Sequence, residues 1–585
     1  MGESVDLRRR EVLRTLVTAP AAATLGSMLW GLPQAWAGTA AALPDLDPVV
    51  HFLRRTSFGI RAADLTAIRA SGIGAYLETQ LASSMVNDTA DAVARARYPL
   101  AHLTGSAYWR TIFPNPVVPK GGDFAGHWPA IAGQVMANQI YRALFSKRQL
   151  FEVMVQFWSN HLNTFDPTFK GAEQQTVIRA NALGNFKTMI GASQRDTAMS
   201  RYLNNGESRK PTPNQNYARE LLELHTLGEG RGYGQPDVLA LSAILSGHTW
   251  DRSRTSATFA EYTYLPSWHV NGDKVLLGTP VAGTGQSEID TALSLIFSAC
   301  APGDAVAYAA QFVAFKLCRH FVSDLPGNAY VPDHIGDIQS GDLVTRAAAA
   351  FYGSGYDIKT VLRYILKSPE FSASADQKFA RPMEAGVGLL RTLDVSETEV
   401  LPDELTSYLQ KLVVDGLEGP NNKTINRTVA AIPAVPEGVV GALTTYVRDG
   451  GNLPGYWPTP DGYPDKGTFW GSATQFITRW NYIAAECERD VKQEILTISP
   501  TGPTGPTSST RAARRVPNVA MPARQLVRLL ASSLLHRNLS ADHETVVAAF
   551  VAGGHAERTL SAGEVAYMAS AAATVLLSSP YMQLR

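Results

Sequence analysis

The stretch that decides the fold begins at Leu150 and reads LFEVMVQFWSNHL as far as Leu162. Its apolar side chains recur at intervals of three and four residues, which places them on one face of an α-helix. The same spacing predicts helices over the ranges 62–81, 130–162, 173–192, 216–227, 236–245, 305–322, 341–352, 358–366 and 523–535. We therefore expect a mainly α fold, with a large multi-helical domain, long ordered loops and few short strands.

Strand patterns are rare, and the clearest alternation runs from Ala257 to Leu265. Long segments rich in Gly, Pro, aromatic and polar residues interrupt the helices at 210–215, 251–280 and 451–469. Loops of this length are usually either functional or disordered. Their Trp and Tyr content favours order, so we expect them to be ordered loops.

The composition is that of a globular protein, with 45% hydrophobic and 18% charged residues among 585. Lys and Arg total 52, as do Asp and Glu, so no overall charge favours a nucleic-acid partner and we expect none. The cysteines Cys300, Cys318 and Cys487 form no CxxC pair. Their spacing argues against a disulfide framework, a cysteine zinc site or an iron–sulfur cluster.

The first 37 residues have the three parts of a secretory signal. The arginines of Arg8–Arg10 begin a twin-arginine pattern, an uncharged stretch follows from Thr15 to Trp36, and Ala35-Trp36-Ala37 fits a cleavage site. We expect export by the twin-arginine route, a periplasmic or extracellular location, and no stable transmembrane span after cleavage. The alternative is an N-terminal membrane anchor.

The remaining chain divides by composition. Residues 38–497 are predicted to form the main helical domain, and residues 498–510 form a Gly/Pro/Ser/Thr linker, since no apolar residue follows Ile498 within it. Residues 511–585 have a helical pattern, and this segment is small for an independently folded domain. We expect this C-terminal segment to dock on the main domain.

Several blocks of the sequence carry a family resemblance: LRRTSFG (53–59), FWSNH (157–161), PNQNYARELLELHTLG (213–228), His269 with Lys274 and Gly278, RPME (381–384), and the Gly/Pro/Trp block 456–470 with Arg479. Together they resemble the bacterial domain-of-unknown-function family 1800, over roughly residues 48 to 490. The resemblance implies a large, mostly helical, exported protein with no assigned activity. It also implies a sulfatase-like exported partner, because genes of the family often neighbour a family of that kind.

Two residues depart from the family pattern. Gln215 stands where the family usually has Glu, and Val270 follows His269 where an Asp is usual. If either acidic residue were a metal ligand, this chain would be a weakened or altered member. His248 replaces a Trp of the family pattern, so we do not expect it to be a ligand.

The predicted helix over 216–227 carries the first group of candidate site residues. On a regular α-helix Asn216, Arg219, Glu220 and Glu223 share one face, and His225 lies opposite. Two carboxylates one turn apart are typical of helical metal sites. We predict catalytic roles for the two glutamates and substrate binding by Asn216 and Arg219. The alternatives are a buried structural network, because leucines surround the helix, or a solvated face.

Two histidines complete the predicted site. His161 follows Asn160 at a polar helix end, which suits a ligand or a general base. His269 and Lys274 occupy a Gly-containing turn, where catalytic groups are often positioned. We predict that both histidines are catalytic and that Asn160 and Lys274 bind substrate. Each histidine could instead be a core residue.

A divalent metal is a possible cofactor, with Glu220, Glu223 and His161 as candidate ligands. The Trp-rich and Tyr-rich block 456–464 could line a carbohydrate cleft, or could be a surface loop held by its aromatic side chains. Arg179 could pair with the central glutamates.

Motifs of the common enzyme classes are missing, namely GxSxG, HExxH, the Walker A loop, the EF-hand loop and GxGxxG. Our first hypothesis is a metal-assisted or general acid/base hydrolase that acts on an envelope or extracellular polymer. The second is a non-enzymatic binding or assembly partner of a sulfatase-like exported protein. The third, suggested by the export signal alone, is a redox protein with a non-covalent haem or metal centre.

Overall fold

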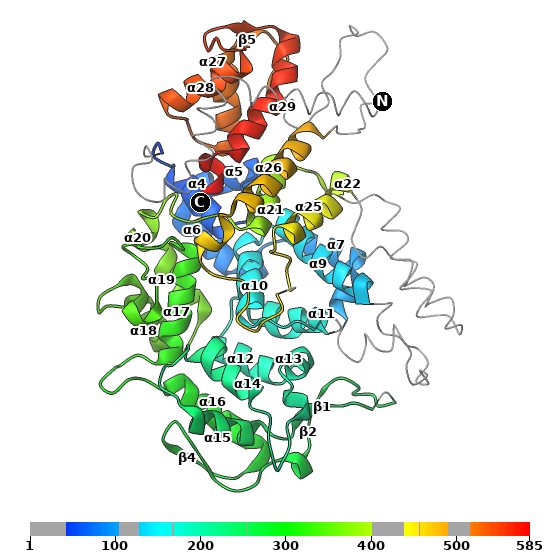
Figure 1. Cartoon of the computed structure of the whole chain (residues 1–585), viewed down its shortest axis with the longest axis vertical. Helices are drawn as coiled ribbons and strands as arrows, with labels where there is room; N and C mark the ends of the chain where they lie inside the picture. The colour runs from blue at the N-terminus through cyan, green and yellow to red at the C-terminus, as the bar shows by residue number, and fades with distance from the viewer. Residues whose placement is uncertain are drawn as a thin grey trace.

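The computed structural model describes residues 43–103, 128–166, 169–253, 255–400, 438–455, 457–489 and 515–585. The predicted signal (1–37) and the predicted linker (498–510) lie outside these ranges. Helices dominate the described residues, and strands occur there only as short two-stranded sheets (Figure 1). The prediction of a mainly α fold is confirmed.

The first half of the chain, blue to green in Figure 1, forms α4 (Pro48–Thr56), α5 (Ala62–Ser71), α6 (Ile73–Leu81), α7 (Thr89–Arg97), α9 (Trp128–Phe145), α10 (Gln149–His161), α11 (Lys170–Glu173), α12 (Phe186–Gln194), α13 (Thr197–Tyr202), α14 (Asn216–Glu220), α15 (Gln235–Leu245) and α16 (Glu288–Ser298). The second half forms α17 (Tyr308–Phe321), α18 (Leu343–Gly353), α19 (Ile358–Leu366), α20 (Pro369–Ser372), α21 (Pro382–Thr392), α22 (Glu397–Val400), α25 (Gly438–Asp449), α26 (Ala473–Glu488), α27 (Ala523–Leu530), α28 (Ala541–Val551), α29 (Ala562–Ser578) and α30 (Pro580–Gln583).

Within the described ranges the strands pair as three two-stranded antiparallel sheets. In the first, β1 (His248–Trp250) pairs with β2 (Tyr262–Tyr264), with His248 opposite Tyr264. In the others, β3 (Lys274–Leu276) pairs with β4 (Thr279–Val281), and β5 (Met521–Pro522) pairs with β6 (Thr559–Leu560). Of the strand predicted over 257–265, only Tyr262–Tyr264 forms a strand.

Several predicted helices are shorter than their patterns, for local reasons. The 62–81 helix is broken at Gly72, which has a φ of 80° that side-chain-bearing residues rarely adopt. The 130–162 helix is broken between α9 and α10, where the Asp88 carboxylate accepts hydrogen bonds from the Ser146 hydroxyl (2.6 Å) and the Lys147 backbone (3.1 Å). A carboxylate from a distant segment thus accepts from the Lys147 N–H, which would otherwise donate within the helix.

Three segments of the described chain are π-helical: Gln174–Arg179, Leu221–Thr226 and Ala531–Leu535. In the second, the Thr226 hydroxyl donates to the Leu221 carbonyl at 2.5 Å, and the Leu227 backbone bonds to the Leu222 carbonyl five residues back. Short π-helical turns are rare and are frequent at functional sites. Two of the three lie in the central part of the chain that contains the predicted site residues.

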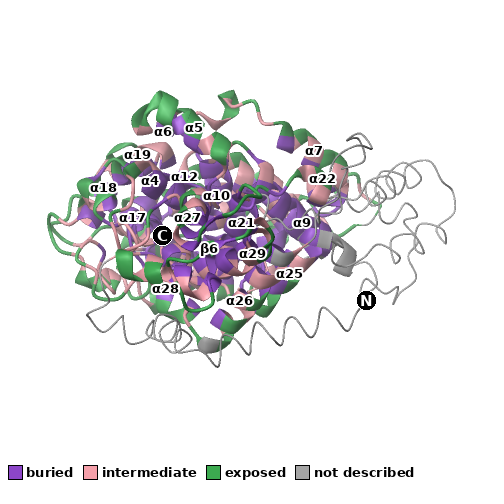
Figure 2. Ribbon diagram, turned by 90° about the horizontal axis from the view of Figure 1, so that it is seen from above, coloured by how far each residue is buried: buried purple, intermediate pink, exposed green. Residues whose placement is uncertain are grey.

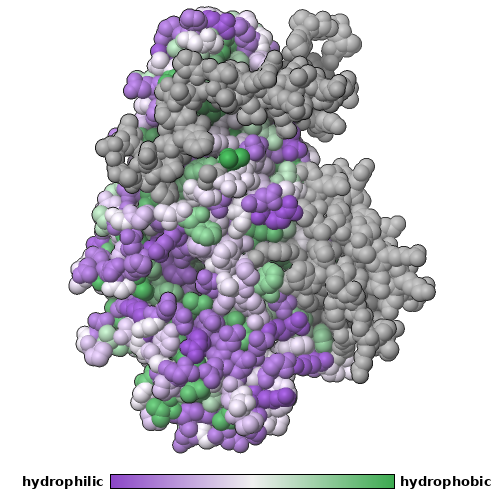
Figure 3. Space-filling view, in the orientation of Figure 1, coloured by the Kyte–Doolittle hydropathy of each residue, from purple (hydrophilic) through white to green (hydrophobic). Residues whose placement is uncertain are grey.

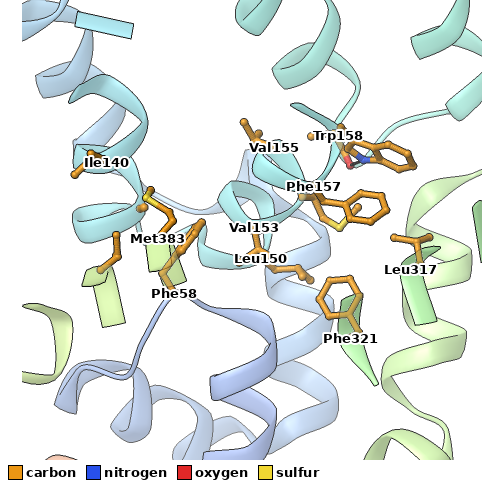
Figure 4. Packing of buried hydrophobic residues seen from close by; sticks show 14 of the residues in the cluster. Phe58, Ile140, Leu150, Val153, Val155, Phe157, Trp158, Leu317, Phe321 and Met383 are labelled. Carbon is orange, nitrogen blue, oxygen red and sulfur yellow. Dashed lines mark hydrogen bonds between the residues drawn. The ribbon is translucent and has the colours of Figure 1, made fainter. Parts of the chain in front are cut away.

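The core is built around α10, which crosses the middle of the molecule (Figure 1). Its apolar face packs against α17 and against residues near α4 and α21 (Figure 4); the labelled core residues include Leu150, Val153, Phe157, Trp158, Leu317, Phe321, Phe58 and Met383. Buried residues fill the interior and exposed ones lie at the periphery (Figure 2). On the face in Figure 3, hydrophilic residues gather over the lower half, with hydrophobic ones scattered among them.

The C-terminal region packs onto the body of the molecule, with α29 lying against α26. Its last residues reach the N-terminal helix: the Arg54 guanidinium donates to the Tyr581 carbonyl at 2.9 Å. The backbones of Lys378 and Arg585 also exchange hydrogen bonds of 3.3 and 2.7 Å. None of the described helices combines the length and the apolar character that a membrane crossing requires.

Candidate functional site

A polar cleft lies where the end of α10 meets α17, the start of α21 and the loop from Asn452 to Trp470. Its titratable lining residues are His161, Lys316, His320, Arg381, Glu384 and Asp465. The cavity volume at this cleft is about 40 Å³, and the cleft opens to solvent. Of the predicted site residues, only Asn160 and His161 line it.

The loop that closes the cleft is held by two asparagines at the end of α10. Asn160 donates to the Tyr463 carbonyl (3.1 Å) and accepts from the Tyr463 backbone N–H (2.7 Å). Asn163 donates to the carbonyls of Trp457 (2.9 Å) and Thr459 (2.8 Å). Gly462 permits this approach, because a Cβ there would lie 2.2 Å from the Asn160 carbonyl oxygen. The polar atoms of Asn160 thus hold the loop in place.

Aromatic side chains fix the same loop from inside. Tyr463 and Trp470 join Phe379 and Phe476 in a small apolar cluster. Asp461 accepts a 3.2 Å hydrogen bond from the Trp457 indole. Residue 456, the first of the block, lies outside the described residues. The described part of the block is therefore an ordered loop held by its aromatic residues, and its Asp465 faces the cleft.

His161 is buried at the base of the cleft. Its Nε2 is 3.0 Å from the His225 carbonyl oxygen, so Nε2 carries the proton and donates it. Its Nδ1 is buried and has no hydrogen-bond partner among the described residues. Burial, together with the charge of Lys316, lowers the pKa of His161 well below its usual value. The ring is therefore uncharged, with a free acceptor nitrogen.

Helix α17 contributes two residues from one face, because Lys316 and His320 are one turn apart. The His320 ring packs edge-on against Phe157, with the centroids 5.2 Å apart. Burial, together with the charge of Lys378, lowers the pKa of His320 well below its usual value. In the described part of the chain, neither the His320 ring nor the Lys316 amine has a hydrogen-bond partner.

Asp465 lies between two cations and makes a long contact with each. Its Oδ2 is 3.6 Å from Lys316 Nζ and its Oδ1 is 3.5 Å from Arg381 Nη2. Burial alone would raise the pKa of Asp465, but the charges of Lys316, Arg381 and Arg319 outweigh it and lower the pKa to about 2. Asp465 is thus ionised at neutral pH. Arg381 Nε is buried without a partner among the described residues.

Glu384 is the last residue of the RPME block, in which Pro382 and Glu384 are typical of a helix start. Its Oε2 accepts from the Arg381 backbone N–H (3.0 Å) and pairs with Arg585 Nη1 (2.9 Å). Burial opposes ionisation of Glu384, but the charges of Arg585, Lys378 and Arg381 hold its pKa below the usual range. Glu384 is therefore a second ionised carboxylate at the cleft.

The glutamates of the 216–227 segment lie elsewhere. The α-helix ends at Glu220, and the following π-helical segment invalidates the helical-face geometry on which the predicted grouping rests. Glu223 accepts from the Tyr233 hydroxyl at 3.3 Å. Burial, with the charges of Glu223 and Asp461, raises the pKa of Glu220. Among the described residues, neither glutamate makes a hydrogen bond or ion pair with His161.

The other polar residues of that segment are bound locally. Asn216 is exposed, and its backbone N–H donates to Asn214 at 2.8 Å. Arg219 donates to Gln235 at 2.8 Å. Arg179, expected near the central glutamates, instead forms two 2.7 Å hydrogen bonds with Glu152. That interpretation of Arg179 is therefore wrong, because Glu152 on α10 lies nearer to it.

His269 and Lys274 form a separate, closed network with Glu288. His269 Nδ1 is 2.8 Å from the Ser246 carbonyl oxygen, and its Nε2 is 3.1 Å from Glu288 Oε1. Lys274 donates to Glu288 Oε2 (2.7 Å) and to the Val270 carbonyl (2.6 Å), and lies 3.3 Å from His269 Nε2. All three side chains are buried and hydrogen-bonded. This arrangement is that of a structural network.

The predicted metal ligands are not gathered into one site. In the ranges that the structure describes, no group of three or more His, Cys, Asp and Glu side chains is arranged to hold a metal ion. Glu220 and Glu223 lie beside Tyr233 and Asp461, whereas His161 lies at the cleft. These three residues therefore do not fit a common metal.

Sequence reasoning missed Lys316, His320, Arg381, Glu384 and Asp465 as site residues. One available signal was the position of Lys316 inside the apolar run 312–318, where a charge needs a partner or a function. Another was that the RPME and 456–470 blocks carried the family resemblance. No local pattern indicates that these blocks meet.

Comparison with known families gives one match. A family model described as a protein of unknown function (DUF1800) covers residues 51–584. No curated protein and no solved structure matches the chain.

Proposed function

The chain belongs to the DUF1800 family, as its sequence blocks predicted, and we propose that it is a hydrolase that uses this cleft for general acid/base chemistry. The substrate is an envelope or extracellular polymer. One observation carries the proposal: the His320 ring lines the cleft beside Lys316 and Arg381 and has no hydrogen-bond partner in the described structure. Burial and the charge of Lys378 lower the pKa of His320, which favours the uncharged ring.

The chemistry follows from these charges. An uncharged imidazole can accept a proton from water as the water oxygen attacks a carbonyl carbon. The carbonyl oxygen then becomes negative, and the cations of Lys316 and Arg381 stabilise it. When the bond to the leaving oxygen or nitrogen breaks, the proton passes from His320 to that atom. Positioned groups of this kind typically accelerate a reaction by about 10² to 10⁴ each.

The two carboxylates favour an ester or amide bond as the target. Glycosidases use one protonated carboxyl group as acid and one carboxylate. Asp465 and Glu384 are both held ionised by neighbouring cations, so neither supplies that proton. An acyl bond of the polymer fits this cleft better than a glycosidic bond.

Export remains part of the proposal. The twin-arginine signal over residues 1–37 would bring the folded enzyme to a periplasmic or extracellular polymer. N-terminal sequencing of protein from the culture and periplasmic fractions checks this, and we expect the mature chain to begin at residue 38. A chain that keeps residues 1–37 in the membrane fraction would contradict export.

A direct test measures the hydrolysis of cell-envelope preparations and of simple aryl esters. We expect His320→Gln to reduce turnover by about 100-fold or more, because it removes the proton acceptor. The melting temperature should change little. The matched control is His555→Gln, which changes an exposed histidine far along the chain and should leave turnover unaffected. Equal turnover in His320→Gln and the natural protein would sink the proposal.

A second candidate is a non-enzymatic binding or assembly protein, for instance a partner of a sulfatase-like exported protein. It is favoured by the fact that Asn160 and His161 bond to backbone groups of neighbouring segments. In that case Asn160→Ala should reduce stability and partner binding together, and no polymer would be cut. The third hypothesis, a redox protein, gains nothing from the contacts of the described residues.

A further inference from the structure

We infer that the cleft recognises a carboxylate group of its ligand, which binds between Lys316 and Arg381. This inference rests on the proposed function for the role of the cleft, and it names the substrate as an acidic polymer. Binding and hydrolysis are measured separately, so either can fail alone.

Lys316 and Arg381 have hydrogen-bond donors that are not used within the protein. An ammonium group has three donors and a guanidinium has five. In the described structure the Lys316 amine makes no hydrogen bond, and Arg381 Nε is buried without one. Buried donors without acceptors are costly, and proteins usually satisfy them. Other arginines, such as Arg55 and Arg537, also have an unpaired Nε, but Arg381 and Lys316 line the cleft, where a ligand can supply the acceptor.

The contacts of Asp465 are longer than those of the most deeply buried lysine–carboxylate pairs. Lys274 to Glu288 is 2.7 Å, Lys170 to Glu173 is 2.7 Å, and Lys378 to Asp324 is 2.9 Å, whereas the less buried Arg54–Asp376 pair measures 3.9 Å. The two pairs made by Asp465 measure 3.6 and 3.5 Å. Asp465 therefore balances part of the cationic charge and accepts one long hydrogen bond from Arg381 Nη2, but it leaves Arg381 Nε and the Lys316 amine without a hydrogen bond among the described residues.

The charge and shape of the cleft also favour a carboxylate ligand. Lys316, Arg381 and the nearby Arg319 outnumber the single charge of Asp465, since Glu384 is paired with Arg585. An added anion would reduce this excess of positive charge. The guanidinium fork of Arg381 matches the two oxygens of a carboxylate. Asp465 already lies between the two cations, one oxygen toward each, so a ligand carboxylate has to share these cations with it.

Calorimetric binding of trigalacturonate, with uncharged trigalactose as the reference, tests the inference on the whole protein. We expect trigalacturonate to bind and trigalactose not to bind. Lys316→Gln or Arg381→Lys should weaken the binding of trigalacturonate by about tenfold or more. Lys466→Gln is the matched control, because it removes an exposed positive charge next to Asp465 and should leave the affinity unchanged.

A variant that is expected to bind more tightly separates a loss of the binding site from misfolding of the protein. Asp465→Asn removes the competing carboxylate, and we expect it to tighten trigalacturonate binding by about tenfold, which a damaged protein could not show. Weaker binding in Asp465→Asn, or equal binding of trigalactose, would overturn the inference. Sulfate or phosphate binding as tightly as trigalacturonate would also overturn it, since the site would then take any small oxyanion.

The two proposals fail in different ways. Trigalacturonate binding without hydrolysis of any polymer would leave this inference standing and refute the hydrolase. Hydrolysis of neutral polymers with no preference for acidic ones would refute this inference alone.

Discussion

Two regions of the molecule each combine a lysine, a carboxylate and a histidine, and they differ in how these groups are paired. In the first, Lys274, Glu288 and His269 are joined by contacts of 2.7 to 3.3 Å. In the second, Lys316 lies 3.6 Å from Asp465, and the nearby His320 has no hydrogen-bond partner within the described ranges. The first network has the saturation that stability requires, whereas the cleft keeps unsatisfied groups that folding alone does not favour.

The comparison teaches that residue type does not separate a site from a scaffold in this protein. Lys274 and His269 occupy a turn of the kind that often carries catalytic residues, yet their polar atoms are already used. Lys316 and His320 belong to a helix with a core-like sequence pattern, yet they line the cleft and make no hydrogen bond within the described ranges. The degree of hydrogen-bond saturation distinguishes the two regions.

The largest effect is expected when the network of His269, Lys274 and Glu288 is broken. Glu288→Ala leaves Lys274 buried without its carboxylate, so we expect the free energy of unfolding to fall by about 3–5 kcal/mol. Urea denaturation measures this. Asp465→Asn should lower the stability by about 2 kcal/mol or less, because water and salt ions can reach Lys316 from the cleft. Equal losses in the two variants would remove the distinction between the regions.

A smaller effect uses pH to sharpen the comparison. The pKa of Asp465 in the folded protein is about 2, below its usual value, so its ionised form stabilises the fold above about pH 4. This contribution, about 2 kcal/mol, is lost as the pH falls from about 4 toward 2. We expect the stability difference between the natural protein and Asp465→Asn to shrink over that interval. A pH-independent difference would show that the neighbouring cations do not act on Asp465.

The smallest effect concerns the π-helical segment beneath His161. Thr226→Ala removes the hydroxyl that bonds to the Leu221 carbonyl, and we expect a loss of about 1 kcal/mol in thermal unfolding. Thr255→Ala, an exposed threonine far from this segment, is the control. Because the His225 carbonyl holds His161, the change should also reduce cleft activity while leaving the His269 network intact. An unaltered cleft would indicate that the π-helical turn plays no part in positioning His161.

Much of the fold could be predicted because helical periodicity is local. The apolar spacing between Leu150 and Leu162 needs no knowledge of the rest of the chain, and α10 follows it closely. The helix breaks at 146–148 could not be predicted in this way. They depend on Asp88, which is distant in sequence and becomes a neighbour only in the folded protein.

The site was harder to predict for the same reason. Asn160 and His161 were identified from a polar helix end, and both do lie at the cleft. Asp465 and Arg381 come from segments more than two hundred residues away, and only tertiary packing brings them to His161. The Glu220 and Glu223 grouping assumed a regular helix, and no propensity in the sequence indicated that a π-helical segment follows Glu220.

The contact of Arg585 with the N-terminal helix has a consequence for folding kinetics. Its guanidinium donates to the Arg54 carbonyl at 2.6 Å and to the Ser57 carbonyl at 2.7 Å, and it also holds Glu384 at the cleft. The Arg54 contact joins residues 531 positions apart. Contacts of such sequence separation form slowly, since closing a long loop costs entropy before any contact rewards it. We expect the cleft to be among the last parts of the molecule to assemble, so a partly folded chain would have a formed core and no working cleft.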